Sequence, residues 1–383
     1  MLHFEYPEFE RRIGSVLQAA DDLGLEGLLL FKQESLYYLT GFDTFGFVFF
    51  QVMYLHKDGR MSLLTRAPDL RQAQATSTIK DIRVWVDGPN ADPASELRQI
   101  LTEYGCKGKK IGIEMEAYGL TMARGLQVQS SMAGFVDLLD ISNLVSVIRT
   151  VKSEAELTYV RRAAELADNA LIKARGLVKT GVFEGDILAA LQGEIFKGDG
   201  DYPANDFIMG SGENALLFRS FAGHRKLAAR DQLSIEFAGV YRHYHAGLVT
   251  TLLVGEPSKQ HLHMHQICVD SLKACEEALR PGEPIGKAFD AYASICDAAG
   301  MRENRFNACG YGLGAAFSPT WMDWPMLYQD NPVLAEPGMV FFPQAILVDS
   351  KTQHVMSVGH TVIVTGDGCE SVSQLGMDLF VSQ

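Results

Sequence analysis

The change of pattern near residue 150 constrains the fold of this chain more than any other sequence feature. Before it, short apolar stretches alternate with segments at helical spacing, which predicts a sheet covered by helices in one domain of about 150 residues. At the change, Ser153 can accept a hydrogen bond from the backbone of Glu156, whose carboxylate can reach back, and a long amphipathic helix follows. We therefore expect an α/β (α+β) chain with two domains, residues 1–148 and 149–383.

The apolar patterns predict individual elements on both sides of this joint. In the first domain, residues 35–42 (SLYYLTGF) and 47–55 (FVFFQVMYL) have the length and composition of strands. In the second, residues 233–255 have the pattern of a β-hairpin that turns about Gly239. Two helices are predicted after it, from Ser258 to about residue 279 and from Ile285 to Gly300.

Composition excludes several classes of protein. The chain has 383 residues with 34 Lys or Arg and 47 Asp or Glu, so its net charge is −13 and phosphate backbones would repel it. No run approaches the ~18–20 apolar residues of a spanning helix, and the start MLHFEYPEFERR is unlike a secretory signal. The six cysteines form no C-x-x-C pair, which favours reduced thiols. We expect a cytoplasmic protein that binds neither nucleic acid nor membranes.

Several phrases along the chain, in order, resemble those of a known family. They are YYLTGFDTFGF, VIRTVKSEAELTYVRRAAELAD, SGEN (211–214), IEFAG (235–239), GYGLG (310–314), EPGMVF (336–341) and HTVIVTGDGCE (360–370). The chain is similar throughout to the creatinase/aminopeptidase-P (M24) superfamily, whose catalytic domain has the pita-bread fold. The resemblance implies a smaller N-terminal creatinase-type α/β domain, a C-terminal pita-bread catalytic domain, and a homodimer.

The peptidases of this superfamily hold two divalent metals with two Asp, one His and two Glu. The matching positions of this chain are Glu236, Gly247, Tyr311, Gln344 and Gly359. Only one of them is a carboxylate, and a pair of divalent cations needs several anionic oxygens. We therefore expect no dinuclear metal site and no cofactor.

A rebuilt mononuclear metal site is an alternative. Glu236, His243, His245 and His360 could together hold zinc or iron, because His243 and His245 share strand parity with position 247. The HLHMH run at residues 261–265 also has ligand-type residues, but its place in a predicted surface helix favours a solvated face.

The loss of metal ligands resembles the metal-free branch of the superfamily, which contains creatinase and the ectoine hydrolases. The phrase EFAGVYRHYHA (236–246) is most similar to the ectoine hydrolases. The catalytic His of creatinase would fall near Arg219, so the chain departs from creatinase there. The resemblance implies a hydrolase of a C–N bond in a small polar substrate, an amidine, guanidine or cyclic amide, with an ectoine-type compound as first candidate.

Three residues are candidates for the catalytic groups. Glu236 would supply the carboxylate that activates water or attacks the substrate, and burial on a strand would raise its basicity. His245 and His360 titrate near neutrality and could move protons. The structural alternatives are that Glu236 pairs with an Arg and that His245 is a hydrogen-bonded core residue.

Six residues are candidates for substrate binding. Arg219 or Arg242 could hold a substrate carboxylate bidentately. His243, Tyr311 and Gln344 could supply further hydrogen bonds. In creatinase-like dimers a loop after the Y-x-x-G phrase reaches the partner's active site, which would make Phe47 an apolar wall there.

The sequence leaves two possible roles for a pair of tryptophans, and it leaves two alternative functions for the protein. Trp321 and Trp324, in SPTWMDWP, could anchor the core or form an aromatic wall for a cationic ligand. The alternative functions are an Xaa-Pro-type metallopeptidase and a non-catalytic ligand-binding protein of the same fold.

Overall fold

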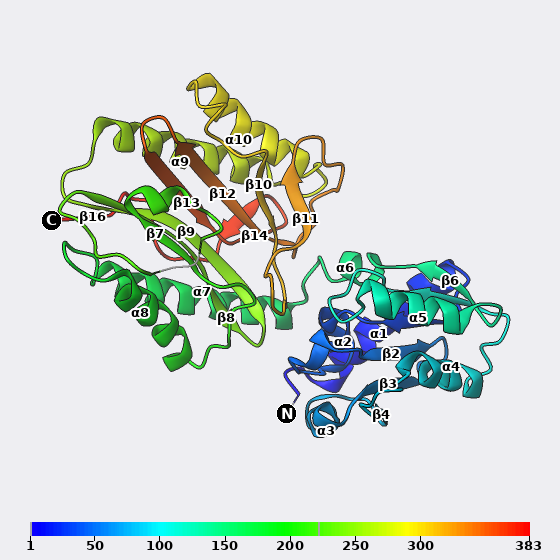
Figure 1. The fold of residues 1–383 in the computed structure, drawn as a ribbon. Helices are drawn as coiled ribbons and strands as arrows, with labels where there is room; N and C mark the ends of the chain where they lie inside the picture. Colours follow the sequence, from blue (N-terminus) through cyan, green and yellow to red (C-terminus); the bar gives the residue numbers. More distant parts are fainter. Residues whose placement is uncertain (1, 221–222) are drawn as a thin grey trace. The chain divides into compact units, whose positions relative to one another are not determined.

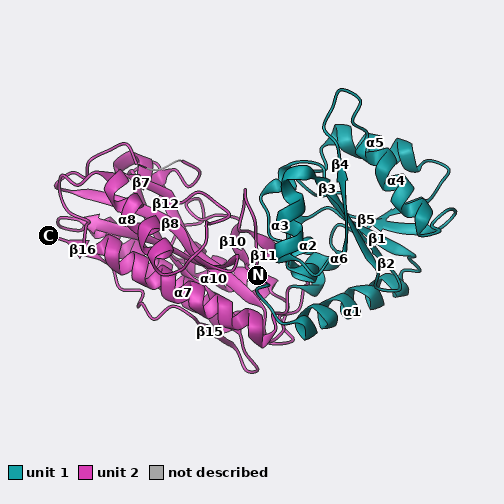
Figure 2. Ribbon diagram, turned by 90° about the horizontal axis from the view of Figure 1, so that it is seen from below, with its two compact units in different colours: residues 1–149 teal, residues 150–383 magenta. Residues whose placement is uncertain are grey.

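The computed structural model describes residues 2–220 and 223–383. The chain divides into two compact units, residues 1–149 and 150–383, so the division lies one residue from the expected boundary (Figure 2). Each unit has its own sheet and its own hydrophobic core.

Unit 1 contains a six-stranded mixed sheet covered by helices on both faces. Its strand order is β4-β3-β2-β1-β5-β6, with β1, β2 and β3 antiparallel and the outer pairs parallel. One core cluster includes apolar side chains of α1, α2 and α3, and a second includes those of α4 and α5. The strands are β1 (Gly27–Leu30), β2 (Val52–His56), β3 (Met61–Arg66), β4 (Asp81–Trp85), β5 (Lys110–Ile113) and β6 (Asp137–Asp140). The helices are α1 (Tyr6–Asp22), α2 (Gln33–Thr40), α3 (Leu70–Thr76), α4 (Pro93–Glu103), α5 (Met122–Met132) and α6 (Leu144–Ile148).

The strand predicted at residues 35–42 was wrong, because most of this segment forms α2. All residues of α2 except Glu34 are buried, so the helix has no exposed polar face. Its apolar run therefore has the pattern of a buried strand. The helix ends at Gly41, whose positive φ of 80° suits the left-handed C-terminal position. The next strand, β2, begins only at Val52, after a short 3-10 turn at Gly46–Val48.

Unit 2 is built on a long curved sheet with the order β11-β10-β12-β13-β9-β8-β7, extended by three short strands (Figure 1). The predicted capping box is present at the start of α7, between Ser153 and Glu156. The strands are β7 (Ile208–Ser211), β8 (Asp231–Tyr241), β9 (Tyr244–Val254), β10 (Ala308–Gly312), β11 (Asp323–Tyr328), β12 (Val340–Asp349), β13 (His354–His360), β14 (Val362–Val364), β15 (Cys369–Ser371) and β16 (Val381–Ser382). The helices are α7 (Glu154–Arg175), α8 (Glu184–Lys197), α9 (Lys259–Ala278) and α10 (Gly286–Ala298).

Helices cover one face of this sheet and leave the other for the site. Figure 1 shows α7 along β8 and β9, and α9 along β12 and β13. A Cβ atom added to Gly239 would lie 2.0 Å from the carbonyl oxygen of Ala163, so glycine permits the close approach of β8 to α7. Glu236 has the opposite strand parity to Gly239 and therefore points to the other face.

The predicted turn at Gly239 was wrong, because β8 and β9 continue to a tighter turn at Arg242 and His243. Both turn residues have positive φ, 51° and 64°, as a two-residue turn between twisted strands requires. The sequence offers no glycine at these positions, and the glycine that suggested a turn serves helix packing. None of the helices in residues 2–220 and 223–383 combines the length and apolarity needed to span a bilayer.

Candidate active site

The strand register brings the five positions matched to metal ligands onto one face of the sheet. Glu236 pairs with Val249, Val249 with Gly359, and Gly359 with Gln344, so these residues form one row across four strands. Tyr311 on β10 lies beside this row, opposite Phe342 of β12. The long hairpin fixes this row, because a slip of one residue would turn Glu236 toward α7.

Two side chains donate hydrogen bonds to the same oxygen of Glu236. The Tyr311 hydroxyl donates to Oε1 at 3.1 Å, and Gln344 Nε2 donates to Oε1 at 3.2 Å. Trp321 Nε1 in turn donates to the Tyr311 hydroxyl at 2.9 Å, which directs the single phenolic proton toward Glu236. Trp321 is therefore an anchor of the site.

The second oxygen of Glu236 is the one available for chemistry. Among the described residues Oε2 has no hydrogen-bond partner, and the atom is not enclosed. Burial raises the pKa of Glu236, while the bonds from Gln344 and Tyr311 and the charge of Arg219 act in the opposite direction. Burial also raises the pKa of Tyr311, so its hydroxyl stays protonated and keeps donating.

Glu236 lies at a cavity of about 370 Å³. The described residues that line this cavity are Asn205, Phe218, Arg219, Glu236, Phe306, Ala308, Gly310, Tyr311, Trp321, Met322, Met326, Gln344 and Ile346. Aromatic and aliphatic side chains form most of its wall, and the polar side chains are Asn205, Arg219, Glu236 and Gln344 with the hydroxyl of Tyr311. This combination suits a small ligand with an apolar body and polar ends.

The residues at the metal positions do not fit a pair of divalent metals. A Cβ atom at Gly247 would lie 2.5 Å from the ring of Phe342, and one at Gly359 would lie 2.7 Å from Val249 Cγ1. Apolar side chains thus fill the places where two ligating side chains would begin. One carboxylate, Glu236, is too few for two such cations.

The rebuilt mononuclear metal site is also contradicted by the geometry. In the described part of the chain, no three His, Cys, Asp or Glu side chains gather as a metal would require. Of the four proposed ligands, only Glu236 lines the cavity.

His245 holds the backbone instead of facing the cavity. It is fully buried; its Nδ1 is 2.8 Å from the carbonyl oxygen of His243, and its Nε2 accepts from the backbone N–H of Ala204 at 2.9 Å. Burial lowers the pKa of His245 to about 3, so the ring stays neutral. The prediction that His245 moves protons is therefore not supported, and the open alternative of a hydrogen-bonded core histidine describes it.

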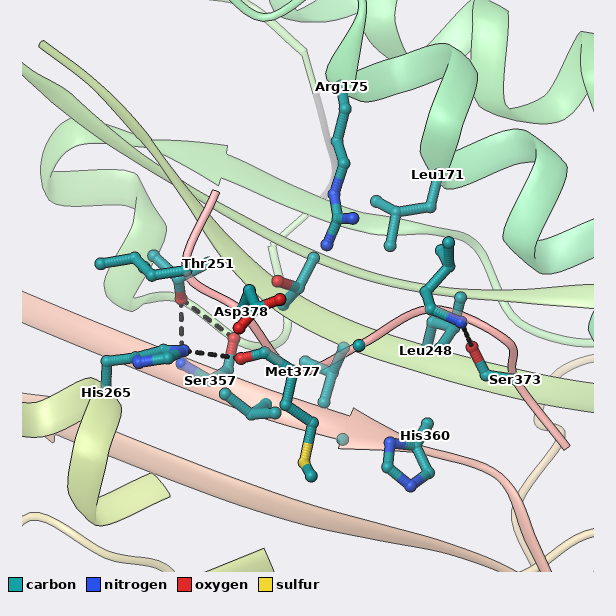
Figure 3. Close-up of a pocket in the computed structure, with 17 residues that line it drawn as sticks. Leu171, Arg175, Leu248, Thr251, His265, Ser357, His360, Ser373, Met377 and Asp378 are labelled. Carbon is teal, nitrogen blue, oxygen red and sulfur yellow. Dashed lines mark hydrogen bonds between the residues drawn. The ribbon is translucent and has the colours of Figure 1, made fainter. Parts of the chain in front are cut away.

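His360 lies on the opposite face of the sheet from Glu236. It directly follows Gly359, and neighbouring residues of a strand point to opposite faces. Its Nε2 is 2.8 Å from Glu276 Oε1 on α9, although the atoms are not aligned for a hydrogen bond. Figure 3 shows His360 at a cavity of about 30 Å³ with Arg175 of α7 and His265 of α9. The structure does not bring His360 to the candidate site.

Arg242 and His243 lie at the tip of the β8–β9 hairpin and do not line the cavity. The guanidinium of Arg242 is 3.6 Å from Asp199 and 4.9 Å from the ring of Tyr241. The ring of His243 stacks on Phe317 with centroids 4.3 Å apart. Their predicted role in substrate binding at Glu236 finds no support within unit 2.

Phe47 belongs to unit 1, where it is buried with 7% of its surface exposed. Phe45, Val48 and Phe49 of the same segment are 87%, 54% and 48% exposed, so these are the apolar side chains that the segment leaves accessible on unit 1. Of the predicted site residues, the structure brings four together at one cavity: Arg219, Glu236, Tyr311 and Gln344.

The sequence analysis missed much of the cavity wall. The lining side chains not predicted from the sequence are Asn205, Phe218, Phe306, Ala308, Met322, Met326 and Ile346. Strand parity could have found Ile346, which lies two residues after Gln344 on β12 and faces the same way. The segments that carry Asn205 and Phe218 are not strands, so no periodicity pointed to them.

Comparisons with known proteins agree with this architecture. Residues 12–151 match the creatinase/prolidase N-terminal domain, and residues 158–366, more than half of the chain, match metallopeptidase family M24. The chain belongs to metallopeptidase family M24. This confirms the expected family, the two-domain pita-bread architecture and the general expectation of an M24 hydrolase.

Individual relatives cover the chain from end to end. An uncharacterised hydrolase/peptidase of Sinorhizobium fredii is 26% identical over 394 residues, covering 100% of this chain and 99% of the relative. An ectoine hydrolase of Halomonas elongata is 24% identical over 407 residues, covering 99% and 98%. The prolidase of Thermococcus sibiricus has a similar fold, with a TM-score of 0.88 at 20% identity, covering 97% of this chain and 99% of that structure.

Proposed function

We propose that this chain is a metal-independent hydrolase of a C–N bond in a small polar compound, with an ectoine-type cyclic amidine as first candidate. One observation carries the proposal: Glu236 lines the cavity, and Tyr311 and Gln344 both bind its Oε1, which leaves Oε2 for chemistry. The whole-length similarity to an ectoine hydrolase supports the choice of substrate.

The polar groups of the cavity suit a zwitterion with an apolar ring. Gln344 donates its Nε2 protons to Glu236 and Tyr311, which leaves its Oε1, with Glu236 Oε2, to accept from the N–H groups of an amidine. Arg219 and Asn205 can bind a carboxylate at the other end of the ligand. The aromatic and methionine side chains of the wall suit a small ring.

Glu236 has to perform both proton steps, because the other described titratable groups of the cavity are Arg219 and Tyr311. In the first step Oε2 accepts a proton from water as the water oxygen bonds to the amidine carbon. In the second, Oε2 returns that proton to the departing nitrogen as the C–N bond breaks. The hydroxyl proton of the intermediate then passes through Oε2 to the amine as the carbonyl forms, so an amidinium and water give an amide and an ammonium group. A carboxyl group whose pKa is raised by burial suits both steps.

We also propose that the chain forms a homodimer, as the family resemblance implies. Light scattering of the purified protein tests this proposal, since a mass near 42.2 kDa would indicate a monomer and contradict it.

The catalytic proposal is tested with Glu236→Gln. The amide can still accept from Tyr311 and Gln344 through its oxygen, so the fold is expected to persist. Ring opening of ectoine would be followed by mass spectrometry, with a chelator present and bound metal measured by plasma mass spectrometry. The control is Glu213→Gln, which removes an exposed carboxylate that does not line this cavity. We expect turnover with the chelator in the wild type and in the control, and a loss of at least about 1,000-fold in Glu236→Gln.

Four results would contradict the proposal. Turnover that needs added metal, or cleavage of Xaa-Pro dipeptides, would favour the metallopeptidase alternative. Ectoine binding without turnover would favour a ligand-binding protein. Unchanged turnover in Glu236→Gln would remove Glu236 from the mechanism.

A further inference from the structure

A single buried carboxylate, that of Glu184, receives four hydrogen bonds. Glu184 is the first residue of α8 and is 2% exposed. Its Oε1 accepts from the backbone N–H of Ser211 at 2.8 Å and from the Ser211 hydroxyl. Its Oε2 accepts from the backbone N–H of His224 at 3.0 Å and of Arg225 at 3.2 Å. The mechanism above makes no use of this group.

These partners are the two ends of one chain segment. Ser211 is the last residue of β7, and His224 and Arg225 lie where the chain returns to α8. Between them lie Phe218 and Arg219, which line the cavity at Glu236. One carboxylate therefore ties together both ends of the segment that supplies the cation of the cavity.

Further contacts at the same place show that the ends are built to stay together. Arg225 Nη1 donates to the Ser211 hydroxyl and, at 2.6 Å, to Asp231 Oδ2. The backbone N–H of Glu184 donates to the carbonyl oxygen of Arg225 at 2.9 Å. A Cβ atom added to Gly223 would lie 3.5 Å from the backbone of Gly185, so the returning chain passes close to the first turn of α8.

Within the segment, the cavity residues make few contacts of their own. Phe218 meets the ring of Phe306 edge to face, with centroids 5.9 Å apart. Arg219 has no hydrogen bond or ion pair with a described residue, and only its charge acts on Glu236. The position of Arg219 therefore depends on the backbone of its segment, in which the N–H of Ser220 donates to the carbonyl oxygen of Leu217 at 3.2 Å. The two ends of this segment are fixed by the Glu184 carboxylate, and charge-assisted bonds to a desolvated carboxylate are strong.

We propose that Glu184 is a positioning residue for substrate binding. It holds Arg219 and Phe218 at the cavity and thereby sets the affinity for a ligand with a carboxylate end, without touching the reacting atoms. The effect on substrate affinity rests on the proposed function above. The role of Glu184 in fixing the segment that carries Phe218 and Arg219 does not depend on that function.

The test uses Glu184→Gln in the full chain. A glutamine oxygen can serve one pair of donors, but its NH₂ group would then face the other pair, so one end of the segment is released. We expect amide hydrogen exchange in residues 212–224 to rise at least about tenfold. With ectoine as the probe, at a pH where the rate does not depend on pH, KM should rise about tenfold while kcat changes less than about threefold, since Tyr311 and Gln344 still bind Glu236.

The matched control is Asp168→Asn. Asp168 on α7 is 7% exposed and likewise accepts from a serine hydroxyl and a backbone N–H, those of Ser373 and Gln374, at 2.6 and 2.7 Å. It should leave exchange in residues 212–224 and KM at wild-type values.

If Glu184→Gln fails to fold, Ser211→Ala decides the question, because it removes one bond to the carboxylate and should raise exchange in the same residues by a smaller factor. Unchanged exchange in 212–224, or a rise equal to that in the control, overturns the proposal. Faster exchange with unchanged KM overturns the role in substrate binding. Failure of the wild type to open ectoine would refute the proposed function. The exchange result would still test whether Glu184 fixes the segment that carries Phe218 and Arg219.

Discussion

The two units are expected to respond to pH in opposite directions, because each contains a fully buried group whose pKa the fold shifts. In unit 1, Glu114 accepts from the backbone N–H groups of Phe31 and Lys32, both at 2.8 Å, and from the Ser35 hydroxyl at 2.5 Å. Burial raises its pKa from 4.5 to about 7. The folded unit therefore binds this proton more tightly than the unfolded chain, and stability is lost as pH rises from 4.5 through 7.

In unit 2, the buried His245 has the opposite effect. Its pKa falls from 6.5 to about 3, so the folded unit resists protonation and stability is lost as pH falls below 6.5. Applying the linkage relation to both groups, a change from pH 5 to pH 8 costs unit 1 about 2.5 kcal/mol and gains unit 2 about 2 kcal/mol. For domains of this size these values correspond to shifts in melting temperature of roughly 4–10 °C.

Native-state hydrogen exchange, read separately in the core strands of each unit, measures how the free energy of unfolding of each unit changes with pH. Glu114→Gln is the critical variant, because an amide oxygen can accept from both backbone donors while its nitrogen donates to Ser35. It should reduce the pH dependence of the stability of unit 1 and leave the pH dependence of the stability of unit 2 unchanged. His245→Asn should do the converse at lower overall stability. If Glu114→Gln leaves the slope of unit 1 as it was, the linkage reasoning fails for that group.

Three further predictions concern unit 2. Gly239→Ala places a methyl group against the α7 backbone and should lower the free energy of unfolding by about 3 kcal/mol, measured in urea; a change below about 1 kcal/mol would contradict the packing argument. Trp321→Phe weakens the Tyr311 hydroxyl as a donor, so the pKa of Glu236 should rise and the acidic limb of the pH–rate profile should move upward; an unmoved limb would count against this relay. Of the five cysteines in unit 2, only Cys369 is partly exposed, so a thiol reagent should modify the other four only after unfolding; rapid labelling of all five in the native protein would refute this.

Strand parity accounts for most of what the sequence could predict about the site. Glu236 and Gln344 lie where the motif placement put them, because long hydrogen-bonded strands leave little freedom in register. The same rule explains the error at His360, which follows Gly359 directly and so had to face α9. His245 has the parity of the cavity face but lies near the hairpin tip, where the backbone of Ala204 covers it.

Other errors came from segments where periodicity carries little information. The helix α2 is buried on all sides, so its apolar run resembled a strand. Arg219 was placed by analogy with creatinase, yet its position in space depends on a bond pattern at Glu184 that no local motif encodes. Side chains on irregular segments, such as Asn205, are positioned by tertiary contacts, which a single sequence does not display.

The packing of Phe342 over Gly247 has a consequence for how this site can change. A carboxylate introduced at position 247 alone would begin 2.5 Å from an aromatic ring, so this substitution is expected to lower stability. Shortening Phe342 first would instead open a void in the wall of the sheet. Either order passes through a less stable variant, so the packing of Phe342 over Gly247 opposes stepwise introduction of a ligating side chain at position 247.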